Sequence, residues 1–355
     1  MIESRFGEST PFSVGVEEEI MILDEESLEP VGAVEVLVRE SEGLDLPGTL
    51  KTELHASVVE LNTNVCATAE EAVSALAELR AAAVAIARRN GLRIAAAGSH
   101  PVTPPEELPV VQEPRYLEMI AYVGASARRQ GVSGLHVHVG VESGEACFHA
   151  LEGVLPWLPL VLALSVNSPY LGGVETGLLS NRAAILAELP RSGAPPAFRS
   201  YADWESWVER LVRLGVTADY TRLWWDVRPH PRFGTLEVRM PDQPTALART
   251  GAFVGLIQQL VARIVREPPP AYDPGRRGDY QQNRWAALRF GMEAELIHPD
   301  GEPALPARDL AAELYERLGS APAELGEPEA ARQLEIGRAE GLRAVCADLA
   351  ARTVA

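Results

Sequence analysis

The chain is poor in cysteine, and its apolar residues never form a long run. Its 355 residues include only Cys66, Cys147 and Cys346, an odd number of widely spaced thiols. That pattern predicts neither a disulfide framework nor a cysteine zinc site. The most apolar stretch, residues 154–166, contains two prolines and is too short to span a bilayer. Because the N-terminus also lacks the basic-then-apolar layout of a secretory signal, we expect a cytoplasmic protein without a membrane partner.

Basic residues are scarce, and lysine is almost absent. The formal net charge of -18 argues against binding to nucleic acid or to an acidic membrane, both of which attract basic surfaces. Lys51 is the only lysine in the sequence. Contacts to a phosphate or a substrate carboxylate therefore fall to arginine, backbone amides, Lys51 or a metal. We interpret Lys51 itself as a solvated surface residue.

Three common motifs for binding nucleotides or presenting nucleophiles are missing. The sequence contains no G-x-x-x-x-G-K-[ST] loop, no G-x-G-x-x-G before a helix and no G-x-S-x-G. A nucleotide, if one binds, would have to be held largely by metal ions and arginine.

Three consecutive glutamates interrupt an apolar run near the N-terminus. The pattern of residues 12–23 predicts a strand. Because side chains on a strand alternate between its faces, Glu17 and Glu19 share one face and Glu18 lies on the other. Two buried carboxylates side by side repel each other, so a hard cation with oxygen ligands is expected between them. The alternative is an edge strand with a solvated acidic face. We expect Glu18 to be structural or solvated.

A second strand carries two histidines in strict alternation with apolar residues. In residues 133–141, His136 and His138 lie on one face, and Leu135, Val137 and Val139 on the other. This pattern favours a site over two satisfied core histidines. A histidine pair of this kind also occurs in metal hydrolases, so it does not specify the reaction.

The segment from residue 223 to residue 240 predicts an antiparallel hairpin with charged side chains. Glu237 and Arg239 share a face of its second strand, and Asp226 and Arg228 share a face of its first. The alternative to a functional site is a ladder of ion pairs on a solvated face.

Two further glutamates, Glu53 and Glu60, are seven positions apart. On a helix they would share one face, whereas on a continuous strand they would lie on opposite faces unless a bulge intervened. The spacing alone leaves both arrangements open.

Helices and strands are interleaved along the chain. The predicted helices span residues 68–90, 202–214 and 245–266, with another beginning at Pro114. The predicted strands span residues 12–23, 92–98, 133–141, 223–228 and 234–240. We therefore expect an α+β fold, with a mainly antiparallel sheet and helices on one side. A single domain should cover residues 1–355, with a helical C-terminal part from about residue 271.

Taken in order, these segments resemble the carboxylate–amine ligases of the type 2 glutamate–cysteine ligase family. The resemblance covers roughly residues 12–297. The matching segments are GVEEE at 15–19, residues 53–60, GSHP at 98–101, RY at 115–116, GLHVHVG at 134–140, LSVNSP at 164–169, residues 176–182, WWDVRP at 224–229, GTLEVR at 234–239 and NRW at 283–285. Gln282 departs from the family pattern, which often has an acidic residue there.

The resemblance implies a glutamine-synthetase-like domain in which an antiparallel sheet forms a funnel, with helices packed on its outer side. It also implies a small-molecule reaction that uses ATP and Mg²⁺. The γ-carboxylate of glutamate would be joined, through an acyl phosphate, to an amine such as the amino group of cysteine. Homo-oligomerisation stays open.

The resemblance also assigns roles to individual residues. The implied Mg²⁺ ligands are Glu17, Glu19, Glu53, Glu60, His136 and Glu237. The implied catalytic residues are Arg239, which would contact the transferring phosphoryl group, and Glu237. Arg182 and Arg228 are implied as further phosphate or carboxylate contacts.

Other functions remain open at this point. They are a metal hydrolase built on His136 and His138, a glutamyl ligase with a non-cysteine acceptor, and a non-catalytic binding module. No residue stands out as the base for the incoming amine, although His138 is one candidate.

Overall fold

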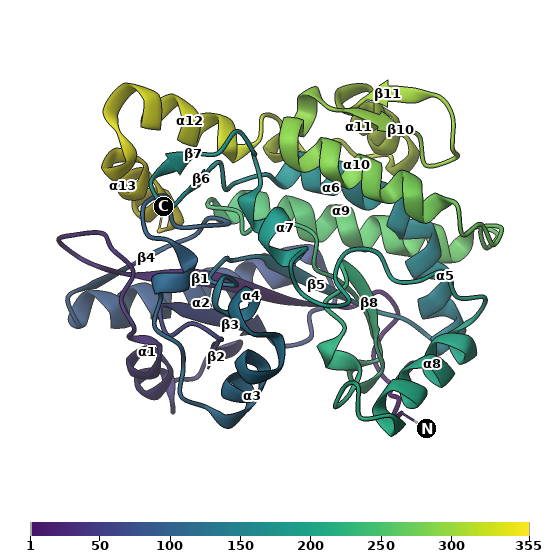
Figure 1. The fold of residues 1–355 in the computed structure, drawn as a ribbon, viewed down its shortest axis with the longest axis horizontal. Coiled ribbons are helices and arrows are strands. Elements are labelled where there is room, and N and C mark those ends of the chain that lie inside the picture. The colour runs from purple at the N-terminus through teal and green to yellow at the C-terminus, as the bar shows by residue number, and fades with distance from the viewer. Residues whose placement is uncertain (1, 355) are drawn as a thin grey trace.

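The computed structural model describes residues 2–354, and a seven-stranded sheet lies at its centre (Figure 1). Its strands are β1 (Val14–Asp24), β2 (Gly48–Thr52), β3 (Val58–Thr63), β4 (Leu92–Ala95), β5 (Leu135–Gly140), β8 (Val227–His230) and β9 (Thr235–Val238). The order is β2-β3-β1-β5-β9-β8, with β4 paired to residues 21–24 of β1. All these pairs are antiparallel, which confirms the predicted α+β fold with a mainly antiparallel sheet.

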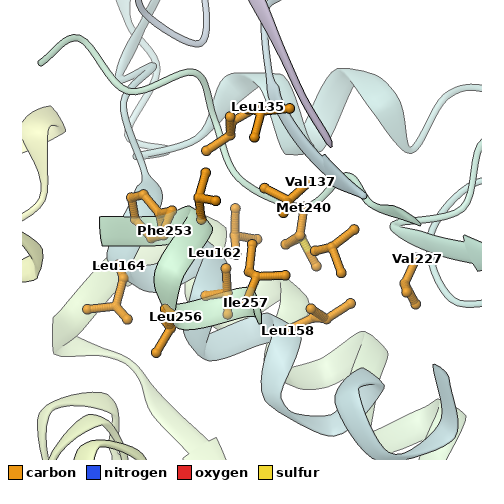
Figure 2. Close-up of a cluster of buried hydrophobic side chains, with 14 of the residues drawn as sticks. Leu135, Val137, Leu158, Leu162, Leu164, Val227, Met240, Phe253, Leu256 and Ile257 are labelled. Carbon is orange, nitrogen blue, oxygen red and sulfur yellow. The ribbon is translucent and has the colours of Figure 1, made fainter. Parts of the chain in front are cut away.

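The helices surround this sheet and provide its apolar partner. They are α1 (Val34–Ser41), α2 (Ala69–Arg89), α3 (Pro114–Val123), α4 (Ala125–Arg128), α5 (Gly144–Val154), α6 (Leu158–Ser165), α7 (Asn181–Leu186), α8 (Tyr201–Arg213), α9 (Leu247–Arg266), α10 (Arg276–Phe290), α11 (Ala307–Leu318), α12 (Glu329–Glu340) and α13 (Leu342–Thr353). Figure 2 shows Leu135 and Val137 of β5 above Leu162 of α6 and Phe253 and Ile257 of α9, all of them buried. One face of the sheet is thus sealed by apolar packing.

The predicted helices are confirmed to within two residues at the ends for which a boundary was given, the usual uncertainty of helix boundaries. Helix α2 begins where the sequence predicted a cap, because the Thr68 hydroxyl accepts a hydrogen bond from the Glu71 amide at 3.2 Å. Its C-terminal stop is at Asn90, followed by Gly91 with φ 68°.

The hairpin of β8 and β9 is present, but β8 starts at Val227 rather than at residue 223. Residues just before it belong to an aromatic cluster instead. Trp225 stacks on Trp207 with ring centroids 5.7 Å apart, and Leu223 is buried in the same cluster. At the turn, Gly234 has φ 68°, and a Cβ there would lie 2.4 Å from the Arg5 carbonyl oxygen, so only glycine fits.

The expectation of a wholly helical C-terminal part is wrong in one respect. β10 (Glu295–Ile297) and β11 (Ala304–Pro306) pair as a small antiparallel hairpin between α10 and α11. Gly301, with φ 109°, interrupts the helical pattern between them. The last helices return to the sheet, where the Thr353 hydroxyl accepts from the Ala96 amide at 2.8 Å.

The apolar segment of residues 154–166 lies almost wholly within a helical region. Residues 144–165 are helical throughout and are long and apolar enough to cross a membrane, but 83% of an 18-residue apolar stretch within them is buried inside the protein. Burial of this kind is typical of a core helix. The three cysteines are buried and form no disulfide, as expected.

Candidate active site

The open face of the sheet collects charged side chains from five strands. Directly paired residues of an antiparallel ladder point to the same side, so the register decides which side chains meet. Glu17 pairs with His136, and Glu19 pairs with Glu60. On the next strands, Glu237 pairs with both His138 and Arg228. These pairings bring together Glu17, Glu19, Glu60, His136, His138, Arg228 and Glu237.

The predicted shared face of Glu17 and Glu19 is therefore confirmed, whereas the alternative of a solvated edge strand is wrong. β1 lies inside the sheet, between β3 and β5. The side chains of Glu17 and Glu19 are only 18% and 13% exposed. The Glu19 carboxylate accepts a hydrogen bond from the Gly134 amide at 2.6 Å.

Glu18 faces the sealed side and is structural. Its carboxylate is fully buried and accepts two hydrogen bonds from Arg80, at 2.8 and 2.6 Å. The Thr250 hydroxyl (2.7 Å) and the Gln243 amide (2.8 Å) complete its shell. Because every one of these bonds is made inside the core, the solvated option for Glu18 is wrong.

Glu53 reaches the same face from the turn between β2 and β3. It is on neither a helix nor a continuous strand, which is why the spacing to Glu60 could not be interpreted. Oxygen atoms of Glu53, Glu19 and Glu60 all lie within 4.8 Å of one another. The turn thus brings together two carboxylates that a straight strand would hold on opposite faces.

Three overlapping groups of side chains could each hold a metal ion. They are Glu17 with His138 and Glu237; Glu17 with Glu60 and His136; and Glu19 with Glu53 and Glu60. In each group the possible ligand atoms lie within 4.8 Å of one another. The resemblance did not place His138 among the ligands, although the alternation of β5 put it on the same face as His136. The His138 Nε2 atom is buried and lies 3.5 Å from Oε1 of Glu17.

The acidic groups of this face differ sharply in their proton affinity. Burial, and then the charge of Glu19, raise the pKa of Glu53 to about 7. Burial and the charges of Glu17 and Glu53 raise the pKa of Glu60 well above its usual range. Burial opposes the ionisation of Glu17 too, but hydrogen bonds from His136 and His138 outweigh it and hold its pKa well below its usual range. Full ionisation of the cluster therefore requires added positive charge.

Glu237 is held by two arginines. Arg228 donates to its carboxylate at 2.5 and 3.1 Å, and Arg239 donates to it as well. Burial alone would raise the pKa of Glu237, but the two guanidinium charges hold it well below its usual range. Arg239 also approaches His136, with 3.4 Å between Nη1 and Nδ1. Glu237 of β9 and Arg239, which directly follows β9, do share a face as predicted, and this face is buried rather than a solvated ladder.

Arg182 holds the backbone next to this charged cluster. Its side chain is 2% exposed and donates to the backbone carbonyls of Arg239 (3.0 Å) and Met240 (3.1 Å). It crosses Gly134 so closely that a Cβ there would lie 2.0 Å from its Nη2 atom. The structure thus assigns it hydrogen bonds that position the Arg239 backbone, and its role as a phosphate or carboxylate contact stays a prediction.

The predicted shared face of Asp226 and Arg228 is wrong. Asp226 precedes β8 and turns toward α10, where it accepts from Tyr280 (2.7 Å) and from Arg284 Nε (2.8 Å). Gln282 lies exposed on the same helix. Asp226 thus anchors α10, while Arg228 belongs to the charged face.

Two pockets meet at the charged face, and Glu17 lines both of them. The α3 pocket, of about 520 Å³, is lined by Glu19, Glu53, Glu60, His136, Arg182, Arg228 and Arg239, by Tyr116 and Met119 of α3, and by residues of the loops that follow α7 and α8. The N-terminal pocket, of about 460 Å³, is lined by residues near the N-terminus, including Arg5, and by Lys51, Asn62, His138, Arg232 and Phe233. Lys51 is exposed, as expected, but its Nζ donates to Asn62 at 2.8 Å within this second pocket.

Comparisons with known proteins agree with the resemblance found in the sequence. The profile of Glutamate-cysteine ligase family 2 matches residues 13–342. A Rubrobacter xylanophilus protein is 42% identical over 339 residues, 95% of this chain and 92% of its own. A protein of Natronomonas pharaonis named glutamate–cysteine ligase is 35% identical over 346 residues, 95% of this chain and 94% of its own.

A solved structure shares the fold. The glutamate–cysteine ligase of Francisella tularensis, crystallised with AMP, superposes with a TM-score of 0.71 over 98% of this chain and 89% of that one. The two sequences are 14% identical, so this likeness concerns the fold.

Proposed function

The chain belongs to glutamate–cysteine ligase family 2 and is a ligase, and from this premise we propose that it uses ATP and Mg²⁺ to join the γ-carboxylate of glutamate to an amine. One observation carries the proposal. A buried cluster of carboxylates and arginines lies between two pockets, and Glu17 belongs to both pocket walls. A reaction between a nucleotide and an amino acid needs this arrangement, with one ligand on each side of a charge-neutralising centre.

The N-terminal pocket is the better candidate for ATP. Three cations, Arg5, Lys51 and Arg232, line it and suit phosphate oxygens. Phe233 supplies an exposed aromatic face on which an adenine base could stack. The α3 pocket then takes glutamate and the amine, next to Arg228 and Arg239.

The donor set of the charged face fits Mg²⁺. Carboxylate oxygens of Glu17, Glu19, Glu53, Glu60 and Glu237 dominate it, and hard cations prefer oxygen ligands. The raised pKa values of Glu53 and Glu60, which lie among other carboxylates, support a site whose negative charge a cation would balance. When bound, Mg²⁺ neutralises and orients phosphate oxygens. Glu17, Glu19, Glu53, Glu60, His136, His138 and Glu237 would hold it.

The chemistry divides into two displacements. A γ-carboxylate oxygen of glutamate attacks the γ-phosphorus of ATP, the bond to the bridging oxygen breaks, and ADP leaves. The amine nitrogen then attacks the acyl carbon, phosphate leaves with the former carboxylate oxygen, and the nitrogen loses a proton as the amide forms. Arg239 acts in the first step as a fixed cation beside the transferring phosphoryl group. Glu237 and the backbone bonds from Arg182 hold its guanidinium there.

The hydrolase alternative fits less well. A zinc hydrolase favours histidine-rich ligand sets with few carboxylates, whereas each group on this face includes at least two glutamates and the third consists of glutamates alone. The hydrolase alternative predicts bound zinc in the purified protein and no affinity for nucleotides. The cytoplasmic location, the lack of nucleic-acid and membrane partners, and homo-oligomerisation stay predictions from the sequence.

Trapping the acyl phosphate tests the proposal without knowledge of the amine. Hydroxylamine converts an acyl phosphate to a hydroxamate, so ATP, Mg²⁺, glutamate and hydroxylamine should yield glutamyl hydroxamate and ADP together. Glu237→Gln should lose both products while remaining folded. If ADP formation is independent of glutamate, or no hydroxamate forms, the ligase proposal is wrong.

A further inference from the structure

We propose that Asn62 is a positioning residue for both the nucleotide and the metal. Its side chain holds the Lys51 ammonium on one side and the Glu60 carboxylate on the other. The inference rests on the proposed function, and it concerns two residues, Lys51 and Asn62, to which the resemblance assigns no role.

The strand register brings the three side chains to one face of the sheet. Lys51 of β2 stands directly across from Glu60 of β3, and Asn62 stands directly across from Glu17 of β1. Glu60 and Asn62 are two positions apart on the same strand and therefore point to the same side. Glu60 lines the α3 pocket, whereas Lys51 and Asn62 line the N-terminal pocket. The three side chains thus extend from one pocket to the other.

An amide lies between the two opposite charges. Cross-strand neighbours of opposite charge favour a direct ion pair, but the Lys51 ammonium donates to Asn62 Oδ1, at 2.8 Å. Asn62 Nδ2 donates in turn to Glu60 Oε1, at 2.7 Å. These partners fix the orientation of the amide, because only its oxygen can accept from an ammonium and only its nitrogen can donate to a carboxylate. Asn62 is 8% exposed, so the amide itself is shielded from water.

This arrangement leaves both partners able to bind a ligand. Among residues 2–354, Asn62 is the one hydrogen-bond acceptor of the Lys51 ammonium, and the remaining N–H groups of this exposed side chain are free for phosphate oxygens. Glu60 belongs to two of the three groups that could hold a metal ion. Because Asn62 bonds to Oε1 of Glu60, the other carboxylate oxygen can still face a cation.

The link restrains two side chains that would otherwise have to be ordered by their ligands. A lysine has many rotamers and loses much of this freedom when it holds a phosphate. The bond to a buried amide removes part of that freedom in advance, so the entropic cost of binding is smaller. A hydrogen bond to a metal ligand likewise fixes the orientation of that ligand. Asn62 should therefore affect the binding of both Mg²⁺ and the nucleotide, whereas Lys51 should affect the nucleotide alone.

Titration calorimetry of the full-length protein with Mg²⁺ alone tests the Glu60 side of the link. Asn62→Leu should bind Mg²⁺ about tenfold more weakly than the parent protein, the lower end of the loss typical of a residue that hydrogen-bonds to a metal ligand. Lys51→Met should bind Mg²⁺ at least as tightly as the parent protein, because it removes a cation. Equal Mg²⁺ affinity in Asn62→Leu and the parent protein overturns the inference.

A double-mutant cycle with a non-hydrolysable ATP analogue tests the Lys51 side. At saturating Mg²⁺, Lys51→Met should weaken binding of the analogue about tenfold and Asn62→Leu about threefold or more, as expected for lost or loosened hydrogen bonds to a charged group. The double variant should bind no more weakly than Lys51→Met, since Asn62 acts on the nucleotide through Lys51. Full additivity of the two losses overturns the inference, because a purely structural role of Asn62 would weaken binding whether or not Lys51 is present.

The single lysine also gives a direct spectroscopic readout. Protein that contains isotope-labelled lysine has one lysine side-chain signal in its NMR spectrum, that of Lys51. In metal-free Asn62→Leu this signal should move to the position of a freely solvated lysine, and in the parent protein it should move when the ATP analogue and Mg²⁺ are added. A signal that is the same in metal-free Asn62→Leu and in the metal-free parent protein overturns the inference.

The same measurements separate failure of the inference from failure of the proposed function. If the analogue binds to the parent protein in Mg²⁺ but binds equally well to Asn62→Leu, the inference alone is wrong. If the analogue does not bind to the parent protein in Mg²⁺, the proposed function is wrong as well. Asn62→Ala removes the same amide with a smaller side chain, and it replaces Asn62→Leu in all three measurements if thermal unfolding shows that the leucine variant is not folded.

Discussion

The two faces of the central sheet are built from the same strands, but their carboxylates have opposite surroundings. On the sealed face, Glu18 is fully buried, and every hydrogen bond to it comes from a protein group, chiefly Arg80. On the open face, Glu53 and Glu60 crowd together and their pKa values are raised. The carboxylate of Glu18, which the fold needs, is supplied with partners, whereas Glu53 and Glu60 of the proposed cation site are left short of positive charge.

The largest expected effect separates these faces by stability. Glu18→Ala leaves the buried Arg80 guanidinium without its carboxylate and should lower the free energy of unfolding by about 3–5 kcal/mol. Glu60→Gln, on the neighbouring strand but on the open face, should lower it little or even raise it in metal-free protein. Chemical denaturation of both variants measures the difference. Similar losses in the two variants would remove the contrast between the faces.

The next effect concerns activity alone. Arg239→Lys keeps the charge but loses the planar fork that contacts Glu237, so we expect kcat to fall about 10²–10³-fold with the melting temperature nearly unchanged. Steady-state kinetics and thermal unfolding of the same preparation measure the two quantities. Turnover within a factor of a few of the parent protein would exclude Arg239 from phosphoryl transfer.

The contrast between the two faces can be predicted from the sequence only where the residues involved are close to each other along the chain. Alternation along a single strand was enough to separate Glu17 and Glu19 from Glu18, and to put His136 beside His138. It could not place Glu53, which reaches the cluster from a turn. Nor could it show that Arg80, far away along α2, pairs with Glu18. Partners that are set by the packing of distant elements leave no periodic signal.

Asp226 illustrates the same limit. It stands two residues from Arg228, so a strand pattern predicted a shared face. The aromatic packing of Trp225 and the bonds from α10 instead end the strand before Asp226 is reached. Tertiary contacts here override the local preference for a strand.

A smaller effect is expected for the affinity of the protein for Mg²⁺. Glu60→Gln removes one charged ligand and should weaken Mg²⁺ binding at least about 10–100-fold. Losses of this size are typical when a residue that only hydrogen-bonds to a metal ligand is replaced, so the loss of a ligand itself should be no smaller. Titration calorimetry with Mg²⁺ alone measures it, and Glu70→Gln, at an exposed position on α2, is the control. Unchanged Mg²⁺ affinity would exclude Glu60 from the metal site.

The smallest effect is a pH dependence of stability. Since the pKa of Glu53 is raised to about 7 in the folded protein, its neutral form is favoured there, and its contribution to stability is present below about pH 4.5 and lost as the pH rises through about 7. For this partly hydrated group we expect a loss of about 1–2 kcal/mol in metal-free protein. Denaturation between pH 4.5 and 8 should show this contribution in the parent protein, and its absence in Glu53→Gln. An identical pH dependence of stability in the parent protein and in Glu53→Gln would show that folding does not raise the pKa of Glu53.

The most direct test of the central claim is titration calorimetry of a non-hydrolysable ATP analogue with and without Mg²⁺. If the open face is a cation-dependent nucleotide site, the analogue binds at one per chain in Mg²⁺, binding is lost in EDTA, and Glu18→Gln retains it while Glu17→Gln does not. Binding that is equally strong without Mg²⁺, or no binding in its presence, would contradict the account.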